Sequence, residues 1–130
     1  MDRPRVLTGR PLEEEIGFAR AIRVGNRIEV SGTAPTLPDG SPAGGDNPYQ
    51  QAIACLSIIR DAIEELGGEL EHVYRTRMFI VRAADGAEVG RAHGSIFSAL
   101  KPAATMVVVA GLLDERWLVE IEAFAEVPVD

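Results

Sequence analysis

The sequence predicts an α+β domain in which a single β-sheet carries two helices on one of its faces. Two segments have apolar residues at helical spacing, and five shorter segments have the alternation or the apolar runs of strands. Clusters of Gly, Pro, Asn and Asp separate these segments, which follow one another in the order β-β-α-β-α-β-β. With 130 residues the chain suffices for one hydrophobic core, so we expect a single domain over residues 1–130.

The first third of the chain predicts an N-terminal arm, a β-hairpin and a long loop. Residues 1–16 are mixed and acidic and are expected to form an arm that either docks on the domain or frays from it. Strands are predicted from Phe18 to Val24 and from Arg27 to Thr33. Gly25-Asn26 between them suits a two-residue turn, because both residues tolerate positive φ. The Pro-, Gly- and Asp-rich residues 34–47 predict a loop.

A helix is predicted from Pro48 onward. Asp46-Asn47-Pro48 combines a capping residue with Pro at the first helical position, and Gly67-Gly68 stops the helix. The positions expected to face the core recur at helical spacing. They are Ala52, Cys55 or Leu56, Ile59, Ile63 and Leu66.

The second half predicts a strand, a helix and two further strands. The strand covers residues 73–81, with Tyr74, Thr76, Met78 and Ile80 on one face. The helix covers residues 86–100 and is closed by Pro102. Its inward positions are Val89, Ala92 or His93, Ile96 and Leu100. The last two strands cover residues 105–110 and 117–127.

The last predicted strand has two different faces. One is an apolar row and consists of Trp117, Val119, Ile121, Ala123 and Ala125. On the other face, Glu120 and Glu122 lie between Leu118 and Phe124. Carboxylates in such a setting are costly unless they meet water, a partner or a ligand, so we expect a site beside this strand. Several strands are apolar on both faces, which predicts a homo-oligomer.

Composition and charge disfavour several classes of function. The net charge of −7 disfavours a nucleic-acid partner, because nonspecific binding to phosphates needs the opposite sign. The chain has no apolar run of about 18 residues and no apolar signal-peptide core, so we expect a cytoplasmic protein without a membrane segment. Cys55 is the only cysteine and is expected to be a buried hydrophobe. His72 and His93 are far apart, so no metal site is expected.

Glu120 is the strongest catalytic candidate, since a carboxyl group in either protonation state can orient water for addition to an unsaturated carbon. The alternative is a carboxylate paired across a subunit interface. In the VSGTAP stretch, Gly32 would let a ligand approach the backbone while Ser31 or Thr33 offers a hydroxyl. The alternative there is an ordinary strand end. For His93, a hydrogen-bonded histidine is the alternative to an acid or base.

Four motifs together resemble the Rid family, which is also called YjgF or reactive intermediate deaminase. They are VGNRIEVSGTAP, the helix that ends in Gly67-Gly68, VYRTRMFIV and VEIEAFA, and the resemblance runs from about Ile16 to Val127. It implies a chorismate-mutase-like fold and a homotrimer with a central β-barrel and clefts between subunits. It further implies hydrolysis of small imines or enamines to 2-oxo acids and ammonia, with no cofactor.

The resemblance assigns water positioning to Glu120 but leaves one position unmatched. The family's carboxylate-binding arginine follows a Pro-Ala pair, and Pro102-Ala103 is followed here by Ala104. Met106 replaces a cysteine and Phe18 a frequent tyrosine, so the cleft would be lined by Phe18, Ser31, Gly32, Ala104 and Met106. Arg20 and Arg91 are candidates to supply the missing positive charge.

Two functions follow from this pattern. The first is a hydrolase or deaminase for an imine, enamine or related unsaturated metabolite that does not act as a standard 2-imino acid deaminase. The alternative is a non-catalytic trimeric module that binds a small ligand or a partner. A third interpretation is the ribonuclease label that is sometimes attached to this family. It fits poorly with the net charge of −7.

Overall fold

A computed structural model of the chain describes residues 3–129. The N-terminal half contains β1 (Arg5–Val6), α1 (Pro11–Ile16), β2 (Ala21–Val24), β3 (Arg27–Thr33) and α2 (Pro48–Glu65). The C-terminal half contains η1 (Leu70–His72), β4 (Val73–Ile80), η2 (Ala83–Asp85), α3 (Gly86–Phe97), β5 (Ala103–Val108) and β6 (Val119–Glu126). The expected order of two hairpin strands, helix, strand, helix and two strands is present, preceded by β1 and α1.

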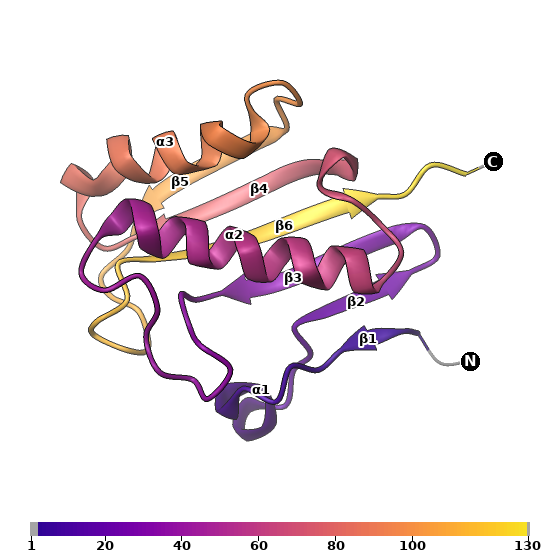
Figure 1. Cartoon of the computed structure of the whole chain (residues 1–130), viewed down its shortest axis with the longest axis horizontal. Helices are drawn as coiled ribbons and strands as arrows, with labels where there is room; N and C mark the ends of the chain where they lie inside the picture. The colour runs from indigo at the N-terminus through magenta and orange to yellow at the C-terminus, as the bar shows by residue number, and fades with distance from the viewer. Residues whose placement is uncertain (1–2, 130) are drawn as a thin grey trace.

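The six strands form one mixed sheet in the order β1-β2-β3-β6-β4-β5. Only β4 and β5 are parallel, and α3 connects them. The helices α2 and α3 pack side by side on one face of this sheet (Figure 1). The sequence prediction of an α+β fold with both helices on one face is confirmed. None of the described helices is long and apolar enough to cross a membrane.

The core lies between α2, α3 and the central strands. The apolar row predicted for the last strand is confirmed, since each of its five residues is at least 95% buried. The predicted inward residues of α2 are also buried, and Cys55 and Leu56 both reach the core. Burial raises the pKa of the Cys55 thiol well above its usual range, which suits its predicted role as a small hydrophobe.

Local signals in the sequence placed several element ends correctly. Gly25-Asn26 joins β2 to β3, with Val24 paired to Arg27 across the turn. The Asn47 side chain caps α2 by accepting a hydrogen bond of 2.9 Å from the backbone N–H of Gln50. Gly67 has a φ of 87°, the left-handed conformation expected after the helix.

Three predictions about the strands and helices were wrong. Tyr74 does not share the buried face of β4, because a bulge between Val73 and Arg75 shifts the pairing with β6 and leaves Tyr74 exposed. The helix α3 ends at Phe97, which is buried, while Leu100 is 41% exposed. The first hairpin strand begins at Ala21 rather than Phe18, because the chain first turns at Gly17.

The N-terminal segment lies against the domain from residue 3 onward. Val6 pairs with Ala21, which makes β1 the edge strand beside β2. The short helix α1 lies below that edge in Figure 1, and its Glu13 side chain is buried. The sheet face opposite α2 and α3 carries no helix of comparable length within the described residues.

Candidate functional site

The site begins at an irregularity in β3. Val30 pairs with Ala123 and Thr33 pairs with Ile121, so two residues of β3, Ser31 and Gly32, lie across one position of β6. Such a bulge bends the strand and redirects its side chains. The Ser31 hydroxyl donates a hydrogen bond of 2.7 Å to the carbonyl of Ala19, which ties the bulge to the start of β2.

The Glu120 carboxylate rests on the bulge at Gly32. A Cβ atom at position 32 would lie only 2.5 Å from Oε2 of Glu120, so this close approach requires glycine. Within residues 3–129, no group hydrogen-bonds to the Glu120 carboxylate. Burial raises the pKa of Glu120; the positive charge of Arg20 opposes this rise, and the negative charge of Glu122 adds to it.

A cavity of about 540 Å³ lies beside Glu120. Its walls come from the N-terminal segment, the end of β3, the loop before α2 and the start of β6. Among the lining residues are Arg10, Phe18, Arg20, Ser31, Gly32, Thr36, Trp117 and Glu120. The predicted loop 34–47 thus forms one side of the cavity, through Ala34, Thr36, Asp39 and Gly40.

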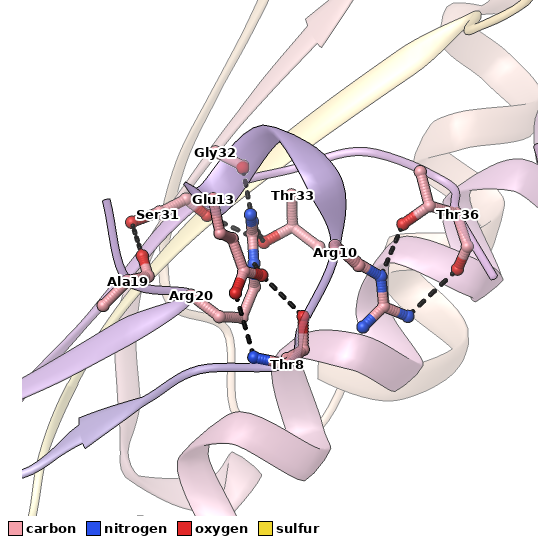
Figure 2. A network of polar contacts seen from close by, with 9 residues as sticks. All are labelled: Thr8, Arg10, Glu13, Ala19, Arg20, Ser31, Gly32, Thr33 and Thr36. Atoms are coloured by element: carbon pink, nitrogen blue, oxygen red, sulfur yellow. Dashed lines mark hydrogen bonds and ion pairs between the residues drawn. The ribbon is translucent and has the colours of Figure 1, made fainter. Parts of the chain in front are cut away.

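Arg20 is 5% exposed and holds three segments together. Its Nη1 donates to the carbonyl of Gly32 at 2.6 Å and to Oγ1 of Thr33 at 3.1 Å, while its Nε donates to the Glu13 carboxylate at 3.2 Å. Figure 2 shows the Glu13 carboxylate between the Arg20 guanidinium and Thr8. The guanidinium also lies 5.1 Å from the centre of the Phe18 ring. Arg20 therefore lies at the predicted site, with most of its N–H groups already engaged.

Arg10 and Trp117 are among the cavity residues that were not predicted as parts of the site. Arg10 donates from Nε and Nη2 to the side chain and the carbonyl of Thr36, at 2.7 and 3.1 Å, and so holds the loop before α2 (Figure 2). Trp117 is 5% exposed, and its indole N–H has no hydrogen-bond acceptor within the described residues. A buried donor without an acceptor is costly, which makes this N–H a candidate donor to a ligand.

The structure separates the predicted site residues into two groups. Phe18, Arg20, Ser31, Gly32 and Glu120 line the same cavity. Ala104 and Met106 lie on β5, two strands away from β6, and neither lines the cavity within this chain. Ala104 is exposed at the sheet edge, and Met106 packs against the hydrophobic core.

Arg91 also lies outside the cavity. On α3 it forms an ion pair with Glu88, at 3.0 Å, and stacks 3.9 Å from the centre of the Tyr49 ring. His93 shares a hydrogen bond of 2.8 Å with Thr76, and burial lowers its pKa, which confirms the hydrogen-bonded alternative.

Glu122, the second carboxylate on this face of β6, has an ion-pair partner, whereas Glu120 has none within the described chain. Arg77 Nε donates to Glu122 Oε1 at 2.6 Å, an ion pair across β4 and β6. This pairing leaves Glu120 as the carboxylate of that face without a cationic partner in the described chain.

One cluster of possible metal ligands occurs among the described residues. Donor atoms of Glu69, Glu71 and His72 lie within 4.8 Å of one another at η1. Both glutamates are exposed, and Nδ1 of His72 already accepts a hydrogen bond from the backbone N–H of Glu69. Glu69 and His72 form the capping box of η1.

The structure is that of an α+β protein with a single mixed sheet, two helices on one face and a cavity at Glu120. Comparison with known proteins identifies its family. The model of the family described as Endoribonuclease L-PSP matches residues 9–127. The chain therefore belongs to this family, which is also called YjgF or Rid.

Similar proteins come from bacteria, archaea and yeast. An uncharacterised protein of Streptomyces coelicolor is 40% identical over 93% of this chain and 90% of its own length. A RutC family protein of Pyrococcus abyssi is 29% identical over 83% of this chain and 84% of its own. The crystal structure of a YjgF/YER057c/UK114 family member from Mycobacterium tuberculosis superposes with a TM-score of 0.88, at 33% identity over 97% of this chain and all of that one.

Proposed function

We propose that this chain is a Rid-family small-metabolite protein in which Glu120 acts on a ligand, or on a water molecule beside it, in the cavity next to β6. The observation that carries the proposal is the state of the Glu120 carboxyl group. It lies in a cavity wall, packs on Gly32 and has no hydrogen-bond partner within the described chain. Groups with perturbed pKa values in clefts are candidates for acid–base chemistry.

The reaction that suits this carboxyl group is hydrolysis of an imine or of the imine tautomer of an enamine. Neutral Glu120 donates its proton to the imine nitrogen, and water adds to the electrophilic carbon. The resulting carboxylate accepts a proton from that water, which yields a neutral carbinolamine. Glu120 then returns this proton to the amine nitrogen as the C–N bond breaks. Its carboxylate takes up the proton of the hydroxyl group as the carbonyl forms, which releases neutral ammonia and restores the neutral acid. A raised pKa favours the neutral acid needed in the first step.

The substrate is expected to differ from a standard 2-imino acid. Ala104 has no donor at the position that the family resemblance gives to an arginine, and the Arg20 guanidinium is largely engaged by Glu13, Gly32 and Thr33. A carboxylate on the substrate would thus lack a bidentate partner, which disfavours such substrates. The indole N–H of Trp117 and the remaining N–H groups of Arg10 are then the donors nearest to a ligand in the cavity.

We also propose a homotrimer with a central barrel. The edge strand β5 exposes Val107 and Val108, and the sheet face without helices carries the half-buried Phe79 and Phe124. Exposed apolar strands at an edge favour association with further chains. In such an assembly Ala104, Met106 or Arg91 of a neighbouring subunit would complete the cavity. A solution mass of three times 14.0 kDa would support this, and a monomeric mass would contradict it. The cytoplasmic location stays a prediction from the sequence.

The test of the proposed function is turnover of freshly generated short-chain 2-imino acids and of neutral imines. Wild type, Glu120→Ala and Ala104→Arg are compared. Turnover by wild type that disappears in Glu120→Ala would support the hydrolase. Activity of Ala104→Arg alone would show an intact scaffold with a different natural ligand. No turnover by any of the three would favour the second candidate.

The second candidate is a non-catalytic trimeric module that binds a small ligand or a partner protein. The missing guanidinium at Ala104 favours it, because binding without turnover does not need a substrate held in a reactive orientation. Unchanged ligand affinity in Glu120→Gln, together with no turnover by wild type, would support this candidate. Ribonuclease activity, which the family description suggests, is tested by incubating the purified protein with RNA at several salt concentrations. Cleavage that weakens with salt would overturn our expectation of no nucleic-acid partner.

A further inference from the structure

A buried carboxylate outside the proposed chemistry is connected to Glu120 through two residues, Arg20 and Gly32. Glu13 on α1 is 5% exposed and accepts three hydrogen bonds. Thr8 donates from its backbone N–H at 2.9 Å and from its hydroxyl at 2.6 Å, and Arg20 donates from Nε at 3.2 Å (Figure 2). Burial alone would raise the pKa of Glu13, but the hydrogen bonds from Thr8 and Arg20 outweigh it and hold this pKa below its usual value.

Gly32 connects the ion pair of Glu13 and Arg20 to Glu120. The carbonyl of Gly32 accepts from Nη1 of Arg20, while Oε2 of Glu120 lies 2.5 Å from the position that a Cβ atom at residue 32 would occupy. Arg20 therefore lies between two carboxylates. It forms a hydrogen-bonded ion pair with Glu13 and acts on Glu120 only through its field, since no hydrogen bond or salt bridge joins Arg20 to Glu120.

We propose that Glu13 is a positioning residue that occupies the Arg20 guanidinium and thereby keeps Glu120 free of an ion pair and available to the ligand. The charge of Arg20 is offset at Glu13, and its side chain is fixed by Gly32, Thr33 and the Phe18 ring. The N-terminal helix thus sets the protonation state of a carboxyl group on the last strand. This inference rests on the proposed role of Glu120, but its test does not require turnover.

Among the charged and titratable groups near Glu120, Arg20 is the one expected to determine how the pKa of Glu120 responds to Glu13. Glu122 lies on the same strand and is paired with Arg77 of β4, and Cys55 of α2 is a buried neutral thiol. Arg10, before α1, binds Thr36, and Asp39 in the loop accepts from Ser41. Arg20, directly before β2, is the cation whose field acts on Glu120. Loss of the Glu13 charge would leave the Arg20 charge without its ion-pair partner. The field of Arg20, which already opposes the rise in the pKa of Glu120, would then lower this pKa further.

The experiment is a carboxyl-carbon NMR titration of Glu120 in wild type and three variants, with the resonance assigned by its loss in Glu120→Gln. Glu13→Gln removes the charge and keeps the volume. Glu14→Gln is the matched control, because Glu14 is exposed on the same helix. The double variant Glu13→Gln/Arg20→Gln removes both buried charges. We expect the Glu120 midpoint to move to lower pH in Glu13→Gln, to stay at the wild-type value in Glu14→Gln, and to lie at or above the wild-type value in the double variant.

Two results would overturn the proposal. One is a Glu120 midpoint in Glu13→Gln that matches the Glu14→Gln control. The other is a double variant whose midpoint falls as far as that of the single variant, because Arg20 would then not transmit the effect. If Glu13→Gln does not fold, the double variant provides the test, because it buries no uncompensated charge. A Glu120 midpoint below the wild-type value in the double variant would then contradict the proposal. A protein without imine turnover that still shows the expected midpoints would refute the hydrolase and retain this inference.

Discussion

Glu13 and Glu120 are two carboxylates near the same arginine, and their surroundings differ in one respect. Glu13 accepts three hydrogen bonds, including one from Arg20, whereas Glu120 accepts none within the described chain. The hydrogen bonds hold the pKa of Glu13 below its usual value, and burial raises that of Glu120. A buried charge with partners stabilises local structure, while one without partners is kept at a cost to stability. The comparison supports the proposals that Glu13 holds Arg20 in place and that Glu120 is available to a ligand.

The largest expected effect is the loss of stability in Glu13→Ala. The change leaves Arg20 buried without its ion-pair partner and removes the acceptor of both Thr8 hydrogen bonds. Breaking a buried pair by removing one partner costs about 3 kcal/mol of unfolding free energy. Urea unfolding measures this cost. Glu15→Ala is the control, because Glu15 is exposed on α1, and we expect a change within about 0.5 kcal/mol. Equal effects of the two substitutions would remove the distinction between Glu13 and its neighbours.

Gly32→Ala is expected to affect activity more than stability. The added Cβ would lie 2.5 Å from Oε2 of Glu120, so the carboxylate must move, and the end of a flexible side chain can do so cheaply. A displacement of about 1 Å at a reacting group lowers turnover on the order of 100-fold. Steady-state kinetics and urea unfolding are measured together. Gly90→Ala on α3 is the control, since a Cβ there meets open space. Unchanged turnover in Gly32→Ala would place the chemistry away from Glu120.

The pH dependence of stability should have opposite signs for the two carboxylates. Glu13 has a lowered pKa in the folded state, so its contribution is fully present above the ordinary Glu pKa and is lost as pH falls through the lower folded value. Glu120 has a raised pKa, so its ionisation costs stability as pH rises through and above the ordinary value. We therefore expect Glu120→Gln to stabilise the protein at neutral pH and to lose this advantage in acid.

Unfolding free energies of wild type, Glu120→Gln and Glu13→Gln, each measured from about pH 2 to about pH 8, test these signs, because the contribution of Glu13 is lost below the ordinary Glu pKa of about 4.3. The difference between Glu120→Gln and wild type should grow with pH. The destabilisation caused by Glu13→Gln should also be largest at neutral pH and shrink in acid. A Glu120→Gln variant that is less stable than wild type at neutral pH would show that this carboxylate has a partner in the assembled protein.

The smallest expected effect is that of Trp117→Phe. Phe retains most of the packing of the ring and removes an indole N–H that has no acceptor within the described residues. The unfolding free energy should stay the same or rise slightly, because an unpaired buried donor is lost. If the N–H binds the ligand, affinity measured by calorimetry should fall by up to about tenfold. A clear loss of stability without a change in affinity would instead indicate an acceptor inside the protein.

The sequence predicted the fold well because its signals are local. The Gly25-Asn26 turn, the Asn47 cap and the apolar row of the last strand depend on residues that are near one another in the chain, and each is confirmed. One error arose where strand pairing changes the phase of the pattern. The bulge at Tyr74 depends on how β4 aligns with β6, and alternation within one strand does not reveal it.

The candidate site was predicted only in part. Glu120 was identified because a carboxylate between apolar neighbours on a strand is unusual, and Gly32 because a strand-end glycine allows close approach. Arg10 and Trp117 gave no comparable signal, since an arginine before a short helix and a Trp at a strand start are common in structural roles. Glu13 looked like one of three equivalent glutamates until the fold buried it and left Glu14 and Glu15 exposed.

By itself, the sequence determined the fold class, the faces of the last strand and the presence of Glu120 among apolar neighbours, because periodicity and turn residues act over short distances. The tertiary structure decided which carboxylate is paired. It brought Arg20 to Glu13 across α1 and β2, placed Gly32 beneath Glu120, and set Ala104 two strands away at the sheet edge. Ion pairs and cavities depend on contacts between distant segments, and these contacts exist only once the sheet and its N-terminal edge have formed.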